Sequence, residues 1–285
     1  MKIRVRSILL APVLVVLLAA ASQSQSAPPP EKTAVIYGQN IRYFEAGQGP
    51  AVILLHGLGS VKEVWLPNLS ALAAKYHVFA IDQIGFGHSD KPLLDYKIGT
   101  WVDSLQAFMQ SQNISKASLV GNSLGGWIAL DFTVQHPEMV DKLVLVDAAG
   151  LAWNQSGPVI ALNPSSVPET RALLESLFYN KKIVTDEFVQ NVFANHMRNN
   201  DGYTIQRTLA SFAQAPFEDE KLKSVRASTL VIWGRQDQLI NVDRAEKFHD
   251  GIAGSKLVVF DQCGHVPQIE KAEAFNQALL DFLAK

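Results

Sequence analysis

Short apolar runs that each end at a glycine, a histidine-glycine pair or an aspartate recur through most of this 285-residue chain. The runs are Ala51–Leu55, Val78–Ile81, Ser118–Val120, Leu143–Val146, Thr229–Trp233 and Leu257–Phe260. Uninterrupted apolar runs of this length are typical of parallel strands that are covered on both faces. A hairpin is predicted ahead of them, because two strand-like segments, 35–37 and 41–44, flank Gly38-Gln39-Asn40.

Helical patterns separate these runs. They cover Gly99–Ser111, Leu124–Gln135, Arg244–Ile252 and Lys271–Leu283. This alternation predicts an α/β fold with a mostly parallel, doubly wound sheet. From Leu151 to Lys223 the rhythm changes: no strand run occurs, and helix-like segments stand at 169–178, 186–197 and 203–213. We therefore predict a core formed by residues 33–150 and 224–285, with a helical cap, 151–223, inserted between two strands.

The N-terminus has the pattern of a secretory signal. Lys2, Arg4 and Arg6 precede an apolar stretch, 8–21, and small and polar residues follow it. We predict a signal peptide at 1–26, a proline-rich linker at 27–32 and export to the periplasm or the exterior. A retained N-terminal anchor is the alternative, and it would place the chain at a membrane.

Composition limits the partners. The chain has 25 Lys and Arg against 27 Asp and Glu, a formal charge of −2, so the basic footprint of a nucleic-acid-binding protein is absent. Its one cysteine, Cys263, excludes an intrachain disulfide and a cysteine-rich metal site. No pattern indicates an oligomeric state.

A nucleophile is predicted at Ser123. The sequence Gly121-Asn122-Ser123-Leu124-Gly125 follows an apolar run and precedes a helical pattern, which is the context that a Gly-x-Ser-x-Gly turn requires. A sharp turn from strand to helix exposes the hydroxyl above the sheet, and only small neighbours fit around it. A glycine-rich helix start capped by Ser123 is the structural alternative.

A serine nucleophile needs a base and an acid that orients the base. His265 follows the last apolar run, which places it at the same sheet edge as Ser123. Asp237 follows the run before it, and Asp147 is its rival at the end of an earlier strand. We predict the triad Ser123, Asp237 and His265. The oxyanion would be held by the backbone N–H groups of Leu124, just after the nucleophile, and Leu58, in the glycine-rich loop after His56.

These motifs together resemble the α/β-hydrolase superfamily. They are His56-Gly57, Asp82-x-x-Gly85-x-Gly87-x-Ser89, Gly121-x-Ser123-x-Gly125-Gly126, Gly234-x-x-Asp237 and Gly264-His265. The resemblance runs from about Thr33 to the C-terminus. It implies an eight-stranded sheet, a helical cap after the sixth strand, and neither a metal nor an organic cofactor. Trp153 in the cap and Val266 after the histidine are expected to contact substrate.

The predicted activity is hydrolysis of carboxylic esters with small to medium acyl chains. Ser123 would attack the carbonyl of a small-molecule ester, His265 would carry the proton, and Asp237 would hold the imidazole. One alternative is a C–C bond hydrolase of meta-cleavage-type dienoates. Those enzymes share the Gly-Asn-Ser turn and the cap, but usually have tryptophan where this chain has Val266, and they use a cap arginine for the dienoate carboxylate. The other alternative is a non-enzymatic binding protein of the same fold.

Overall fold

The computed structural model describes residues 27–151, 160–212 and 219–285. Its sheet has eight strands in the order β1-β2-β4-β3-β5-β6-β7-β8. The strands are β1 (Lys32–Ile36), β2 (Gln39–Ala46), β3 (Ala51–Leu55), β4 (His77–Ile81), β5 (Ala117–Asn122), β6 (Val140–Val146), β7 (Ser228–Gly234) and β8 (Lys256–Phe260). Every pair from β4 to β8 is parallel, and β2 is antiparallel to both of its neighbours. The predicted fold class, a mostly parallel doubly wound sheet, is confirmed.

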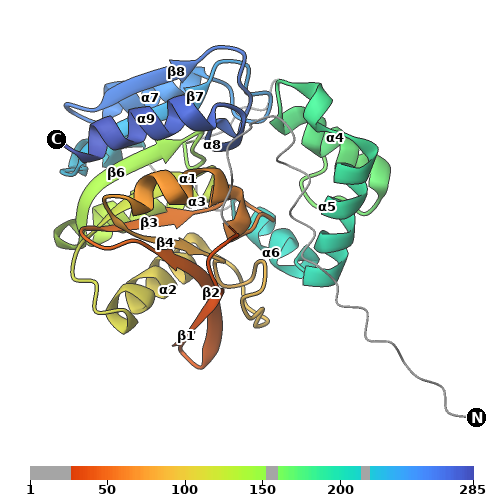
Figure 1. Ribbon diagram of the computed structural model, residues 1–285, viewed down its shortest axis with the longest axis horizontal. Helices are drawn as coiled ribbons and strands as arrows, with labels where there is room; N and C mark the ends of the chain where they lie inside the picture. Colours follow the sequence, from red (N-terminus) through yellow and green to blue (C-terminus); the bar gives the residue numbers. More distant parts are fainter. Residues whose placement is uncertain (1–26, 152–159, 213–218) are drawn as a thin grey trace, which may run out of the picture.

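Helices cover both faces of this sheet (Figure 1). Those of the core are α1 (Leu66–Ala73), α2 (Ile98–Ser111), α3 (Leu124–Gln135), α7 (Asp243–Gly251), α8 (Pro267–Glu270) and α9 (Ala272–Leu283). Successive side chains of a strand point to opposite faces of the sheet, so a strand with no polar residue contributes to an apolar layer on each face. In β3, Val52 and Leu54 pack with residues of α1 and α9, whereas Ile53 and Leu55 pack with residues of α2, α3 and α7.

The predicted cap lies between β6 and β7 in sequence. Its helices are α4 (Val167–Leu177), α5 (Asp186–Asn199) and α6 (Gly202–Phe212), and Figure 1 shows them at one end of the sheet. α6 packs on the core: Ile205 belongs to its main apolar cluster, and the rings of Phe212 and Trp127 are 4.8 Å apart. α4 and α5 pack in a smaller apolar cluster that also includes the core residues Val266 and Ile269. The predicted cap therefore contacts the core through α6 and through this cluster.

Local features differ from the sequence predictions in detail. The hairpin turn is two residues long, Tyr37-Gly38, both with positive φ. The helix predicted at 271–283 is observed as α9, and the short helix α8 directly before it was not predicted. Helix α1, at 66–73, was not predicted either, because eight residues are too few for a clear helical period. The predicted signal peptide, 1–26, lies outside the described residues.

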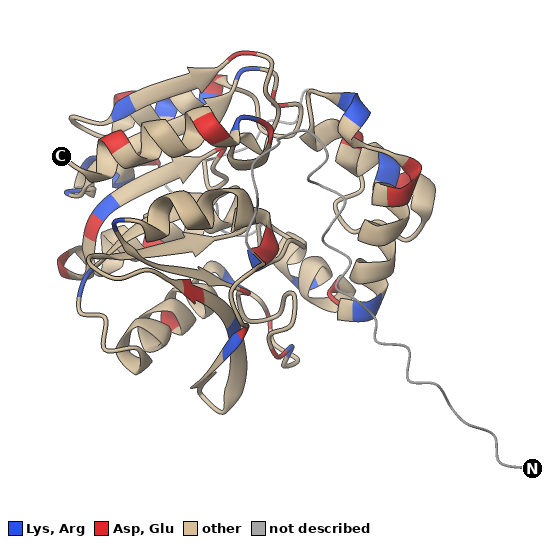
Figure 2. Cartoon of the chain, in the orientation of Figure 1, with Lys and Arg blue, Asp and Glu red and all other residues tan. Residues whose placement is uncertain are grey.

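Charged residues of both signs are interspersed over the core and the cap, as Figure 2 shows. This agrees with the small formal net charge of −2. In the part of the chain that the structure describes, no helix combines the length and the apolarity that crossing a membrane requires.

Candidate active site

Ser123 stands in a sharp turn between β5 and α3. Its backbone has φ 55° and ψ −118°, a conformation that is costly for a residue with a Cβ atom. Glycines allow the turn. A Cβ on Gly121 would lie 2.1 Å from the carbonyl oxygen of Gly125, and a Cβ on Gly125 would lie 2.2 Å from that of Leu55. The turn therefore holds Ser123, half-buried, at the positive end of α3.

His265 lies on the loop between β8 and α8, with its side chain buried. Its Nδ1 is 2.7 Å from Oδ2 of Asp237, which follows β7. The other carboxylate oxygen, Oδ1, accepts hydrogen bonds from the backbone N–H groups of Leu239 and Ile240, at 2.8 and 3.0 Å. A carboxylate can only accept, so it fixes the imidazole proton on Nδ1. Nε2 is buried and meets no hydrogen-bond partner among the described residues. It is thus the nitrogen that is free to take a proton.

The loop after β3 touches the nucleophile turn. A Cβ atom on Gly57 would lie 3.2 Å from Cβ of Ser123, so the two segments are in close approach. Leu58 follows in this loop, and Leu124 is the first residue of α3. Within the described ranges, neither backbone N–H donates to a backbone acceptor outside the regular elements. The structure thus brings the two predicted oxyanion donors into neighbouring segments, each with an available N–H.

His56 supports this loop from beneath. Its ring is fully buried, and its Nε2 accepts a hydrogen bond from the backbone N–H of Gln83 at 3.1 Å. Nδ1 therefore carries the proton and donates it to the carbonyl of Gly57 at 2.8 Å. Burial lowers the pKa of His56, which keeps the ring neutral. His56 is thus a structural residue that orients the peptide after Gly57.

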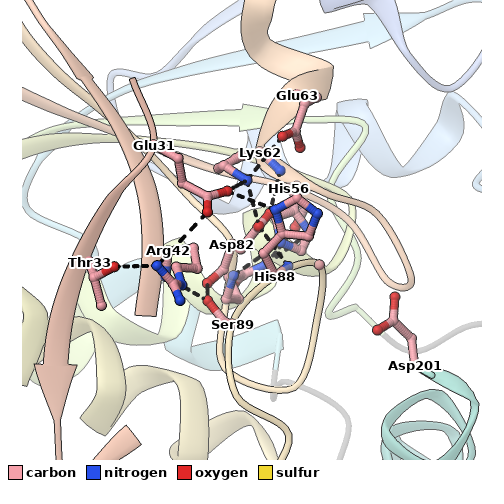
Figure 3. A network of polar contacts seen from close by, with 12 residues as sticks. Glu31, Thr33, Arg42, His56, Lys62, Glu63, Asp82, His88, Ser89 and Asp201 are labelled. Atoms are coloured by element: carbon pink, nitrogen blue, oxygen red, sulfur yellow. Dashed lines mark hydrogen bonds and ion pairs between the residues drawn. The ribbon is translucent and has the colours of Figure 1, made fainter. Parts of the chain in front are cut away.

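A buried ion-pair network anchors the same loop further along (Figure 3). The backbone N–H and the ammonium group of Lys62 donate to the two oxygens of Asp82, at 2.7 and 2.8 Å. The ammonium also lies 2.7 Å from Glu31 and 3.0 Å from Glu63. Burial alone would lower the pKa of Lys62, but the neighbouring carboxylates raise it above its usual range. Lys62 is therefore charged, and sequence patterns gave no signal for this network.

Two groups of described side chains have the spacing of metal ligands. They are Glu31, Asp82 and His88, and Asp147, Asp237 and His265. In the first group, the ammonium of Lys62 already lies against both carboxylates. In the second, Nδ1 of His265 is engaged with Asp237. The carboxylates of the first group are thus compensated by Lys62, and Asp237 in the second group is bound to the imidazole of His265.

Asp147, the rival acid, lies next to Asp237. It follows β6 and is fully buried, and its Oδ1 accepts a hydrogen bond from the N–H of Gly234 at 3.0 Å. Burial, and then the charge of Asp237, raise the pKa of Asp147 well above the usual range. It is Asp237, however, whose carboxylate contacts the imidazole. The structure thus brings together both candidate acids, but gives only Asp237 the hydrogen bond to His265.

Asn122 and Glu270 also hold the histidine loop, and sequence analysis missed both. The amide of Asn122 donates to the carbonyls of Val146 and His265, each at 3.1 Å. Glu270, in α8, accepts three backbone hydrogen bonds, from the N–H groups of Tyr179, Asn180 and Gly264 at 3.1, 2.8 and 2.6 Å. The N–H of His265 itself donates to the carbonyl of Leu177 at 2.7 Å. The backbone of His265 is therefore bound to the last residue of α4, and Glu270 joins the histidine loop to the cap segment that follows.

The residues expected to contact substrate are less defined. Trp153 lies outside the described residues. Val266 is buried in the apolar cluster that α4 and α5 form. The three cap arginines have partners elsewhere: Arg171 pairs with Asp186 and Glu175, Arg207 with Asp95, and Arg198 donates to Asn195. The structure thus records no contact between these arginines and the triad.

Comparison with known proteins gives this geometry a context. Residues 52–278 match a family model described as "Alpha/beta hydrolase family". The chain is 34% identical over 261 residues to a 2-hydroxy-6-oxo-6-phenylhexa-2,4-dienoate hydrolase of Comamonas testosteroni, covering 85% of this chain and 91% of the relative. It is 33% identical over 257 residues to a 2-hydroxymuconate semialdehyde hydrolase of Pseudomonas sp. (strain CF600), covering 85% and 89%. Among solved structures, the meta-cleavage product hydrolase of Pseudomonas fluorescens IP01 superposes with a TM-score of 0.83 at 31% identity, covering 89% of this chain and 97% of that one.

These similarities contradict the prediction of ester hydrolysis. The names of the relatives describe hydrolases of dienoates and of a muconate semialdehyde, not of esters. The motifs indicate nucleophilic attack on a carbonyl carbon, but they do not indicate which group leaves. A serine, a base and an oxyanion hole are needed whether the leaving group is an alkoxide or a carbon. Val266 stands where the C–C hydrolases usually have tryptophan, and this difference was wrongly taken as an argument for ester hydrolysis.

Proposed function

The chain belongs to the alpha/beta hydrolase family and is a hydrolase, and on that premise we propose that it cleaves a carbon–carbon bond in a 2-hydroxy-6-oxohexa-2,4-dienoate, a meta-cleavage product. The observation that carries the proposal is the similarity to a 2-hydroxy-6-oxo-6-phenylhexa-2,4-dienoate hydrolase over 85% of this chain. The geometry around Ser123 also supports the proposal. Cleavage of this C–C bond needs a serine nucleophile and a base such as Nε2 of His265, as ester hydrolysis does.

The reaction begins with a change of tautomer. A dienol carries its 2-hydroxyl in conjugation with the 6-oxo group, and moving that proton to C5 gives a 2,6-dioxo compound with one remaining double bond. C5 then lies between the C6 carbonyl and the conjugated C2 carbonyl. The electron pair of the C5–C6 bond can now leave toward the oxygen on C2, so the carbon leaving group departs as a dienolate.

Ser123 attacks C6 in the next step. Nε2 of His265 takes the hydroxyl proton, and Asp237, 2.7 Å from Nδ1, stabilises the imidazolium that forms. The oxyanion on C6 is held by the N–H groups of Leu58 and Leu124. When the tetrahedral intermediate collapses, the C5–C6 bond breaks, the imidazolium returns its proton to the dienolate, and the acyl group stays on Ser123.

Water completes the cycle. His265 takes a proton from it, the hydroxide attacks the acyl carbon, and the Ser123 oxygen leaves with the proton that the imidazolium returns. The products are a carboxylic acid from the C6 side and a 2-hydroxypenta-2,4-dienoate. One water is consumed, and no electron is gained or lost, so the reaction needs no oxidant or reductant.

The proposal is tested by a direct competition between substrates. The purified protein is assayed with 2-hydroxy-6-oxo-6-phenylhexa-2,4-dienoate, followed by loss of its long-wavelength absorbance, and with p-nitrophenyl butyrate. We expect kcat/KM for the dienoate to exceed that for the ester by about tenfold or more, since only the dienoate uses the whole site in the transition state. Ser123→Ala should lose on the order of 10⁴–10⁶ in kcat.

The matched control is Ser111→Ala, at the exposed end of α2, which should leave both activities unchanged. Faster hydrolysis of the ester would contradict the proposal. Equal turnover by wild type and Ser123→Ala would contradict the mechanism as well. The three cap arginines have their recorded partners elsewhere. Comparison of the dienoate with its methyl ester therefore tests whether the protein recognises the substrate carboxylate at all.

We also propose that the chain is exported, with a small molecule as its substrate. The support is the basic and then apolar sequence of residues 2–21. Fractionation of cells that express the full chain, with mass spectrometry of the N-terminus, distinguishes cleavage near residue 26 from a retained anchor.

A further inference from the structure

Asp147 is a fully buried carboxyl group that the proposed mechanism does not use. It stands at the end of β6, one strand away from Asp237 at the end of β7. Ligand atoms of Asp147, Asp237 and His265 all lie within 4.8 Å of one another. Two carboxyl groups at this separation, both removed from water, cannot both be ionised without a large cost in free energy.

The surroundings of the two side chains decide which one keeps the proton. Asp237 accepts two backbone hydrogen bonds on Oδ1 and faces the imidazole N–H with Oδ2, so three donors stabilise its charge. Asp147 has a single donor, the N–H of Gly234. Its Oδ2 is buried and makes no hydrogen bond of standard geometry within the described chain. The side chain of Asp237 lies close enough to interact with it.

The other titratable groups around Asp147 favour the same assignment. They are Glu270 in α8 and Cys263 on the histidine loop. Glu270, like Asp237, raises the pKa of Asp147 through its negative charge, after the larger effect of burial. Burial also raises the pKa of the Cys263 thiol, so the thiol stays neutral and adds no charge. No cation is recorded among the described groups that act on Asp147.

We propose that Asp147 is a positioning residue of the triad: a neutral carboxylic acid that keeps Oδ1 for the Gly234 N–H and donates its O–H from Oδ2 to the carboxylate of Asp237. A carboxylic acid held neutral by a dry site is a good hydrogen-bond donor. The donated bond spreads the charge of Asp237 and fixes the direction of the carboxylate. The inference rests on the triad chemistry of the proposed function, but not on which bond of the substrate is cleaved.

This arrangement sets how strongly Asp237 stabilises the imidazolium that forms during catalysis. A hydrogen bond donated to Asp237 draws part of its negative charge away from the imidazole, so this stabilisation is weaker than it would be without the bond. Loss of the donor would strengthen the stabilisation. If Asp147 were instead an ionised second acid, loss of its charge would weaken it. The two assignments therefore predict opposite displacements of the pH profile of kcat/KM.

The protonation state is measured first, and without substrate. The full chain is labelled with ¹³C at the aspartate side-chain carboxyl carbon, and the Asp147 resonance is identified by its absence in Asp147→Asn. Asparagine suits the positive φ of 42° at this position, so this variant is expected to fold. We expect the Asp147 resonance to keep its protonated chemical shift from pH 5 to above pH 7. An ionised Asp147 at pH 7 overturns the proposal.

The kinetic test compares three variants on the dienoate. Asp147→Asn keeps both a donor and an acceptor, so its kcat/KM should stay within about threefold of wild type, with the same pH profile. Asp147→Ala should move the ascending limb of the kcat/KM profile to higher pH by about one unit, because Asp237 then stabilises the imidazolium more strongly. Asp147→Gly serves where alanine at this φ prevents folding. Asp237→Asn should lose about 10⁴ in kcat, because the imidazole loses its acceptor.

Two kinetic results would contradict the proposal. If Asp147→Asn loses as much activity as Asp237→Asn, or if Asp147→Ala moves the limb downward, then Asp147 acts as a charge and the proposal is wrong. If the proposed function is wrong, the results differ from both of these. In that case wild type does not cleave the dienoate, while the ¹³C titration still assigns the proton on Asp147, and the pH profile is taken with the ester.

Discussion

Gly57 faces Ser123 so closely that a Cβ atom on the glycine would lie 3.2 Å from Cβ of the serine. A methyl group there forces the oxyanion loop and the nucleophile turn apart by a few tenths of an ångström. We expect Gly57→Ala to fold but to lose about 10²-fold in kcat, because donors misplaced by so little no longer match the transition state.

The matched control is Gly99→Ala in the first turn of α2, where a Cβ meets nothing within 4 Å. It should keep full activity and gain about 0.5 kcal/mol in the free energy of unfolding. Steady-state kinetics and urea unfolding measure both effects. Unchanged kcat in Gly57→Ala would show that the loop is not part of the oxyanion hole.

Glu270 should control the base through the cap. Its carboxylate accepts backbone hydrogen bonds from Gly264, next to His265, and from the cap residues Tyr179 and Asn180. Glu270→Ala removes all of them, so we expect kcat to fall by about tenfold or more, and protease cleavage of the cap to become faster. Glu273→Ala, an exposed acid in the next helix, is the control that should change neither. A loss confined to KM would mean that Glu270 affects only the cap.

Lys62 should be essential for stability. Its ammonium group is fully buried and lies within 3.0 Å of three carboxylates. Lys62→Met leaves those carboxylates without their cation, and we expect a loss of about 3–5 kcal/mol in the free energy of unfolding. Lys32→Met is the control: its ion pair with Glu45 is exposed, so it should cost less than about 1 kcal/mol. Equal effects in guanidinium unfolding would contradict this account.

Asp201 predicts how stability varies with pH. Burial, opposed by Lys91 at 3.6 Å, raises the pKa of Asp201 to about 7. The folded state then binds a proton that the unfolded chain releases near its ordinary pKa, so this group lowers stability as pH rises from about 4 to 7. We expect Asp201→Asn, which lacks this titration, to have a Tm that exceeds that of wild type increasingly from pH 5 to pH 8. Asp103→Asn, on an exposed position of α2, should show a constant difference.

The fold was predictable because its information is local. The apolar runs that became β3 to β8, and the turn at Ser123, need only short stretches of sequence to be recognised. The hydrogen bond between Asp237 and His265 was predictable because parallel strands bring their carboxyl ends to one edge of the sheet. Helix α1 was missed because its eight residues are too few to show a clear helical period.

Contacts across long stretches of chain could not be predicted in this way. Asn122 and His265, or Lys62 and Glu31, are brought together only by the folded sheet, and nothing near either residue indicates its partner. The choice between ester and C–C cleavage failed for a related reason. Both reactions use a serine, a base and an oxyanion hole, so the motifs that report these groups do not distinguish the two reactions.

The hydrogen bond from His265 to the carbonyl of Leu177, with Glu270 beside it, means that cap and core are not interchangeable modules. A chimaera that takes its cap from a relative therefore also replaces two of the contacts that hold the histidine loop. A library that varies residues 177–180 would disturb those contacts, whereas one that varies α5 and α6 alone leaves them in place.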